Sequence, residues 1–208
     1  MGTSSIRFLA VFLRIALLTL AAWMLYKVFS LFPSEYYSEC SRQALSRAMH
    51  SEALYYAEKG ISSRQDNPLL YWRAGEARSL LADPFDGSQV SENKKAELFS
   101  AAIHDYQLGL ELYPQDTSLL LGMAWALDGL KRYVESEPYF IRALAASPHS
   151  YEVRVYYGDH FHVQGKLREA EREYIKSFAL AGNVLAQDRL IRIGEERKAK
   201  TLAPSPAK

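Results

Sequence analysis

The stretch TSLLLGMAWALDGLKRYVESEPYFIRALAASPHS, residues 117–150, has the apolar spacing of amphipathic helices and a turn signal at Pro148. Pro114 lies 34 residues before Pro148, so we searched the chain for a period of that length. Three sets of residues recur at this spacing: the aromatics Tyr106, Phe140 and Tyr174, the small residues Ala102, Ser136 and Ala170, and the small residues Gly109, Ala143 and Ser177. The sequence therefore predicts a helical protein built from repeats.

This register resembles the tetratricopeptide repeat (TPR), a pair of antiparallel helices. Its pattern asks for small residues at the eighth, twentieth and twenty-seventh places, an aromatic at the twenty-fourth and proline at the thirty-second. Four units fit: 34–67, 68–116, 117–150 and 151–184. Gly, Ala or Ser fills all the small places: Ser41, Gly75, Ala124, Gly158, Ala53, Ala102, Ser136, Ala170, Gly60, Gly109, Ala143 and Ser177. Small residues let crossing helices approach closely, and the resemblance implies an all-α, TPR-like solenoid of helical hairpins.

Two units depart from the pattern. The first has Ala57 and Gln65 where an aromatic and a proline are expected. The second is longer than the others, and its surplus falls in residues 83–95, beginning with Asp83-Pro84. A long loop in a compact repeat is either functional or disordered. We therefore expect this insertion to be disordered, to lengthen the second helix of its unit, or to contact a partner.

Beyond the fourth unit the sequence predicts one further helix. Residues 184–198 carry apolar residues between charged ones, as expected for a helix that caps the last repeat. The solenoid would then span residues 33–199. Residues 200–208 contain Pro204 and Pro206 and are predicted to be a disordered tail.

The N-terminal segment, residues 1–32, predicts a membrane anchor. Residues 8–32 are almost entirely apolar, and about 20 helical residues cross a hydrocarbon core of roughly 30 Å. Arg14 interrupts the run near one end, where its long side chain can reach the headgroups, and Lys27 can do the same at the other end. We expect a single-pass transmembrane helix, preceding the solenoid, through which the chain associates with a membrane.

Three interpretations of this segment remain open. In a signal anchor with a cytoplasmic N-terminus, the repeats would lie on the non-cytoplasmic side, periplasmic or extracellular. In a cleaved signal peptide, the small-residue cleavage sites would be near Ala22 or Ser30, and both are poor. In the third, the segment is an amphipathic helix in the membrane plane, or an apolar helix docked on a larger complex.

Composition excludes some functions. The net charge is +1, and residues 1–32 contain three basic residues and no acid, so the remainder is slightly acidic. Nucleic acid is therefore not an expected partner, because it requires a basic surface to offset phosphate charge. Cys40 is the single cysteine, which excludes an internal disulfide and a thiolate metal cluster.

The sequence predicts no enzyme, no metal site and no cofactor. It contains no Gly-rich phosphate loop, nucleophile elbow or HExxH pattern. The best metal candidate combines Asp159, His160 and His162 with His104 or His149. Asp159 and His162 share a helix face, but His160 points away from it, and a metal needs a third converging ligand.

The resemblance also implies a concave groove lined by the first helix of each unit, at its second, fifth, ninth and twelfth places. The partner-binding candidates among these places are Trp72, Glu76, Leu121, Trp125, Asp128, Asp159 and His162. Two tryptophans among carboxylates suggest an apolar or basic segment of a protein partner, either an extended peptide or a helix. The alternative is that both tryptophans only fill the inner curve of the stack. The basic clamp with which the family's chaperone-tail binders hold a carboxylate is absent.

Two functional hypotheses follow. In the first, the protein is a membrane-tethered adapter or scaffold whose groove recruits components of an envelope, secretion or polysaccharide-export assembly. In the second, it is a structural accessory subunit of a larger membrane protein complex. The second hypothesis predicts that Arg14 pairs with an acid on a neighbouring membrane helix.

Overall fold

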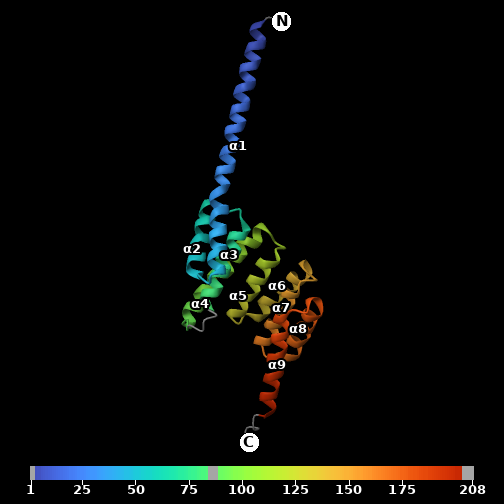
Figure 1. The fold of residues 1–208 in the computed structure, drawn as a ribbon. Coiled ribbons are helices and arrows are strands. Elements are labelled where there is room, and N and C mark those ends of the chain that lie inside the picture. Colours follow the sequence, from blue (N-terminus) through green and yellow to red (C-terminus); the bar gives the residue numbers. More distant parts are fainter. Residues whose placement is uncertain (1–2, 84–88, 203–208) are drawn as a thin grey trace.

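The computed structural model describes residues 3–83 and 89–202 of the chain. All regular structure in these residues is helical (Figure 1). The helices in chain order are α1 (Thr3–Ser46), α2 (His50–Ser63), α3 (Pro68–Ala82), α4 (Glu92–Leu112), α5 (Thr117–Gly129), α6 (Tyr133–Ala146), α7 (Tyr151–Val163), α8 (Leu167–Ala181) and α9 (Val184–Leu202). The predicted all-α class is confirmed.

The helices form hairpins that stack into a solenoid, as predicted. The end of α1 pairs with α2, and the following pairs are α3 with α4, α5 with α6, and α7 with α8. The first helices of successive pairs contact one another and make one layer, while each second helix packs against the next first helix. The helix α9 packs on α8, in the place predicted for a cap.

Side-chain caps fix where the first helices begin. The side-chain oxygens of Asn67, Asp116 and Ser150 accept hydrogen bonds from backbone N–H groups in the first turns of α3, α5 and α7, at 3.1, 2.9 and 3.3 Å. Each cap satisfies one of the donors that a helix start leaves unpaired. Pro68 opens α3 at the position where a missing N–H costs nothing.

Close helix approach explains the small residues of the repeat. The ring of Tyr106 on α4 fits between Gly75 on α3 and Gly122 on α5, where an added Cβ would lie 2.7 Å and 2.4 Å from ring atoms. The ring of Tyr174 meets Gly158 in the same way, at 2.4 Å. The small residue at the eighth place of the repeat therefore packs directly against the aromatic residue at the twenty-fourth place.

Serine at a small place also makes a hydrogen bond. Ser41 on α1 donates to the carbonyl of Ala53 on α2 at 2.8 Å, and Ser177 on α8 donates to the carbonyl of Tyr151 on α7 at 2.8 Å. Both hydroxyl groups are in buried residues, so the bonds satisfy polar groups that would otherwise be costly between the helices. They join the two helices of the first and the last hairpin.

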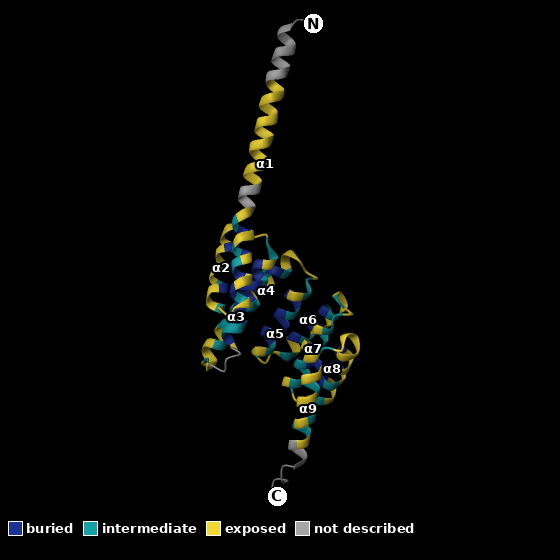
Figure 2. Ribbon diagram, in the orientation of Figure 1, coloured by how far each residue is buried: buried dark blue, intermediate teal, exposed yellow. Residues whose placement is uncertain are grey.

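The helix α1 runs without interruption from the apolar segment into the first repeat. It contains Pro33, so the expected boundary between residues 32 and 33 lies inside one helix. Its apolar half projects from the solenoid (Figure 1), and residues 12–27 of it are exposed, as Figure 2 shows. The stretch Phe12–Ser46 is long and apolar enough to cross a membrane, and its apolar window is not buried within the protein. A signal sequence would have the same features.

The second unit is long partly because its second helix is long. The helix α4 begins at Glu92 and spans 21 residues, so it takes up part of the predicted insertion at 83–95. Residues 84–88 of that insertion lie outside the described residues. The helix α9 continues to Leu202, so residues 200–202 are helical rather than part of a tail. The rest of the predicted tail, residues 203–208, lies outside the described residues.

Candidate functional site

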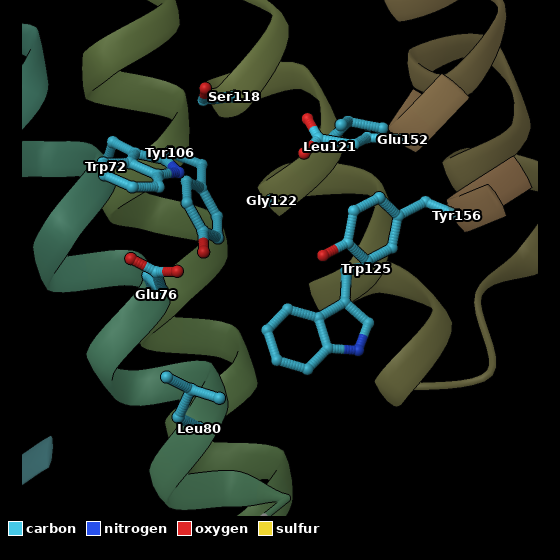
Figure 3. Close-up of a pocket in the computed structure, with 10 residues that line it drawn as sticks. All are labelled: Trp72, Glu76, Leu80, Tyr106, Ser118, Leu121, Gly122, Trp125, Glu152 and Tyr156. Carbon is cyan, nitrogen blue, oxygen red and sulfur yellow. The ribbon is translucent and has the colours of Figure 1, made fainter. Parts of the chain in front are cut away.

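A cavity of about 380 Å³ opens on the layer of first helices, between α3, α5 and α7 (Figure 3). Its walls combine aromatic, aliphatic and acidic side chains. The lining residues are Trp72, Glu76, Leu80, Tyr106, Ser118, Leu121, Gly122, Trp125, Glu152 and Tyr156. We call it the first cavity.

A second cavity, of about 600 Å³, adjoins the first and leads toward α9. Trp125 and Tyr156 line both cavities, so the two form one continuous groove. The polar lining of the second cavity includes Asp128, Asp159, His160, His162, Arg189 and Arg192. The groove therefore crosses the second, third and fourth units and reaches the cap.

All the predicted partner-binding residues lie along this groove. Trp72, Glu76, Leu121 and Trp125 line the first cavity, and Asp128, Asp159 and His162 line the second. Two other residues at the inward places, Ser79 and Val155, are fully buried in the helix stack and do not face the groove. That the groove binds a partner stays a prediction.

Sequence reasoning missed four lining residues of the first cavity: Leu80, Tyr106, Gly122 and Tyr156. Tyr156 is at the sixth place of its unit, is 45% exposed, and directs its hydroxyl into the cavity above the Trp125 ring (Figure 3). Leu80 on α3 follows the twelfth place of its unit by one residue and also lines the cavity. Tyr106 is a core residue, and the edge of its ring lines the cavity as well. The only sequence signal for Tyr156 was its position one turn before the inward-facing residue at place nine.

Few favourable interactions compensate for the burial of the Glu76 carboxylate. Burial raises the pKa of Glu76, and the positive charge of Arg73 only partly opposes this effect. Glu76 accepts no hydrogen bond from any described residue. Arg73 is itself buried, with its guanidinium carbon 5.6 Å from the centre of the Trp72 ring, and burial lowers its pKa. The first cavity thus contains an acid for which the ionised form is disfavoured.

Several carboxylates act on Tyr156 together. Partial burial raises the pKa of the Tyr156 phenol, and the negative charges of Glu152, Asp159 and Glu76 raise it further. Glu76 belongs to α3 and the others to α7, so these acids surround the groove from two helices. The charged residues that line the first cavity are Glu76 and Glu152. The charged side chains of this lining are therefore all acidic.

The second cavity differs, because its carboxylates have partners within the chain. Asp159 accepts hydrogen bonds from the Tyr174 hydroxyl and from Nε of Arg189, both at 2.7 Å. The Asp128 carboxylate lies 2.9 Å from Nδ1 of His160. Burial and the charge of Asp159 raise the pKa of Tyr174, so its hydroxyl stays protonated and donates. These bonds hold α5, α7, α8 and α9 together.

The residues considered for a metal do not converge. Asp159 bonds to Tyr174 and Arg189, His160 to Asp128, and His162 lies 2.9 Å from the Glu196 carboxylate. His104 and His149 are both exposed on other helix faces or turns. Within residues 3–83 and 89–202, no three His, Cys, Asp or Glu side chains are grouped to hold a metal ion.

Ser136, His160 and Asp128 lie together, but not as a catalytic triad. The Ser136 hydroxyl and the Asp128 carboxylate both contact Nδ1 of His160, at 3.2 and 2.9 Å. A catalytic histidine takes a proton from serine on one ring nitrogen and is oriented by the acid through the other. Ser136 is also fully buried, so no substrate reaches its hydroxyl. The group is a structural polar network.

Comparison with known proteins gives the fold but no relative by sequence. No family model matches the sequence, and no curated protein matches it. Among solved structures, the chain is similar to TTC0263, a thermophilic TPR protein from Thermus thermophilus, with a TM-score of 0.69 and 18% identity. The match covers 79% of this chain and 81% of TTC0263. MamA from Desulfovibrio magneticus, residues 41 to the end, gives TM-score 0.58, 17% identity, and coverage of 80% and 86%.

The TPR domain of Arabidopsis OM64 is also similar, with TM-score 0.53, 18% identity, and coverage of 67% of this chain and 98% of that domain. At such low identity, these similarities establish the TPR-like fold and nothing about partners. The predicted TPR-like solenoid is therefore confirmed.

Proposed function

We propose that this protein is a membrane-tethered adapter that binds a segment of a partner protein in its concave groove. The observation that carries the proposal is the first cavity, where Trp72 and Trp125 face an open space instead of filling it (Figure 3). Tryptophan in a concave, partly desolvated site is typical of the residues that dominate binding energy at protein interfaces. We assign no catalytic step and no cofactor.

The length of the groove fits an extended peptide or one face of a helix. Its two cavities follow one another along α3, α5 and α7, with Trp125 and Tyr156 between them. A segment lying along the groove would meet separate sites for successive side chains. Single side chains would thus contribute specificity, while the rigid helix stack keeps the sites in place.

Membrane tethering is supported by the exposed apolar half of α1. Its described apolar residues are not buried against the solenoid, and burial in lipid would remove them from water. As a signal anchor with a cytoplasmic N-terminus, it would hold the repeats on the non-cytoplasmic side. Confinement at the membrane raises the effective concentration of a partner in an envelope, secretion or export assembly, so a weak groove would suffice.

One observation favours the alternative function, a structural accessory subunit. Arg14 is exposed on the apolar half of α1, and a charge inside the hydrocarbon core is unfavourable, by about 2.5–3.5 kcal/mol at the bilayer centre and by less toward its ends. An acid on a neighbouring membrane helix would remove much of that cost. In that case the membrane helix would make the specific contact and the groove would be secondary.

Photocrosslinking from the full-length protein in membranes separates the two functions. The crosslinking residue p-benzoylphenylalanine would replace Leu80 in the first cavity or, as a control, Ile141, which is 54% exposed on α6. An adapter gives a partner crosslinked from position 80 and not from 141, and a Trp72→Ala/Trp125→Ala variant of unchanged helicity loses it. If position 80 captures the same neighbours in that variant, the groove is not the binding site and the accessory subunit replaces the adapter.

A further inference from the structure

We propose that the first cavity is a pocket for one lysine or arginine side chain of the bound segment. The inference rests on the proposed function and names the partner chemistry that the groove selects. The first cavity would take a cationic side chain at one position of the segment. The rest of the groove would accept apolar residues as well.

The charges around the cavity favour a cation. Glu76 on α3 and Glu152 on α7 line it from facing helices (Figure 3), and no basic side chain is among its lining residues. Arg73 is the positive charge that lowers the pKa of Glu76, but it is 6% exposed and lies beside the Trp72 ring, outside the cavity lining. A cation between the two acids would be attracted by both, and an anion repelled by both.

The aromatic walls favour the same occupant. Trp72, Trp125 and Tyr156 present their rings to one space. An ammonium or guanidinium group within about 6 Å of such ring centres is attracted by their electron-rich faces. The apolar stem of the side chain would pack on Leu80 and Leu121, so a long side chain fits better than a small cation.

Glu76 has hydrogen-bonding capacity that no described residue uses. Its carboxylate accepts no hydrogen bond from any described residue, whereas Asp159 in the second cavity already binds Arg189 at 2.7 Å. An N–H donor of lysine or arginine would give Glu76 a charge-assisted hydrogen bond. Glu152 is more exposed than Glu76, so it is placed to meet the cation at the cavity entrance.

The cavity has room for this side chain. Its volume of about 380 Å³ is many times the roughly 30 Å³ that one water molecule occupies in the liquid. An apolar side chain would also fit by volume, but it would bury Glu76 without compensation. The test must therefore compare charged and uncharged side chains of the same length.

The experiment starts from a displayed library of random dodecapeptides, selected on the full-length protein in lipid nanodiscs. We expect lysine or arginine to be enriched at one position. A selected peptide is then resynthesised with norleucine or glutamate at that position. Norleucine should weaken binding by about tenfold or more, and glutamate should abolish it.

A pair of protein variants assigns the effect to the cavity. Glu76→Gln should weaken the lysine peptide and should not weaken the norleucine peptide, so the two changes are coupled in a double-mutant cycle. Glu135→Gln is the matched control, because Glu135 is an exposed acid on α6, away from the groove. It should leave both peptides unchanged.

Two opposite results are distinguishable. If norleucine binds as well as lysine, or if the selected peptides share no basic position, the cation pocket is wrong and the adapter function stands. If selected peptides bind equally well to the Trp72→Ala/Trp125→Ala variant, the groove is not the binding surface, and the proposed function fails with the inference.

Discussion

The Nδ1 atom of His160 on α7 lies 2.9 Å from each carboxylate oxygen of Asp128 on α5, although 32 residues separate them in the sequence. His160 is 1% exposed, and the Ser136 hydroxyl donates to the same carboxylate. One acid thus satisfies polar groups from two other helices. The third and fourth units are joined by a polar contact as well as by apolar packing.

Asp128→Ala should therefore destabilise the solenoid. Removing the carboxylate takes away the shorter contact of His160 Nδ1 and one acceptor of the Ser136 hydroxyl, and the loss of such buried, charge-assisted hydrogen bonds costs about 1–3 kcal/mol. Urea unfolding of the full-length protein in detergent, followed by far-UV circular dichroism, measures the change. The control is Glu135→Ala, which removes an exposed ion pair with Arg132 and should leave the midpoint unchanged. Equal midpoints for Asp128→Ala and wild type would contradict the prediction.

Gly158→Ala should destabilise the fourth unit. The added Cβ would lie 2.4 Å from the ring of Tyr174, which is fully buried and cannot move aside freely. Overpacking of this kind costs about 1–3 kcal/mol.

The matched control is Gly194→Ala on α9, where no atom lies within 4 Å of the added Cβ. There the helix should gain about 0.5–1 kcal/mol, because glycine is a poor helix residue. Urea unfolding compares the two variants with wild type. Equal stability changes would show that the Tyr174 contact does not require glycine.

Glu76→Gln should stabilise the free protein at neutral pH. Burial raises the pKa of Glu76 above its ordinary value of 4.5, against the partial effect of Arg73. As pH rises above 4.5, the unfolded chain loses this proton first, so stability falls until the pKa of the folded state is passed. Glutamine stays neutral and avoids the loss. Tyr106, Tyr156 and Arg73 are the other titratable groups electrostatically coupled to this carboxylate.

Thermal unfolding at pH 4 and pH 7 tests this sign. Glu76→Gln and wild type should differ at pH 7 and converge toward pH 4. Glu39→Gln is the opposite case, because hydrogen bonds from Arg42 and Gln43 lower the pKa of Glu39 to about 2. The ionised Glu39 side chain therefore stabilises the folded state above pH 4.5, and this stabilisation is lost as the pH falls toward 2. The Glu39→Gln variant should therefore not be more stable than wild type at pH 7. A Glu76→Gln variant that is less stable than wild type at pH 7 would refute the assignment.

The repeat could be predicted because its determinants are local. Gly158 and Tyr174 recur in register with Gly75 and Tyr106, and each contact lies within one hairpin or between neighbours. The partnership of Asp128 with His160 could not be predicted in the same way. It depends on how α7 is rotated about its own axis relative to α5. The periodicity does not determine which residue of α7 then faces Asp128.

The boundary at Pro33 shows a second limit. Proline is a helix-breaking signal, because it removes one backbone donor and crowds the preceding turn. The helix α1 nevertheless continues through it, since Ser34, Ser38 and Ser41 of the following turns are buried in the first hairpin. Tertiary packing outweighs the local penalty. The groove residue Tyr156 was missed for a similar reason, because its exposure depends on the curvature of the stack.

The side of the membrane on which the repeats lie is open to a direct chemical measurement, because Cys40 is the single cysteine. In a Cys40→Ser/Glu135→Cys variant, the new thiol replaces an exposed side chain on α6. A membrane-impermeant maleimide added to intact cells, with the outer membrane permeabilised where one exists, should label it, because the signal-anchor interpretation places the repeats outside the cytoplasm. A peptide tag on the N-terminus should stay protected from protease until the cells are lysed. Labelling of the thiol only after lysis, with the tag accessible beforehand, would place the repeats in the cytoplasm and restrict partners to that compartment.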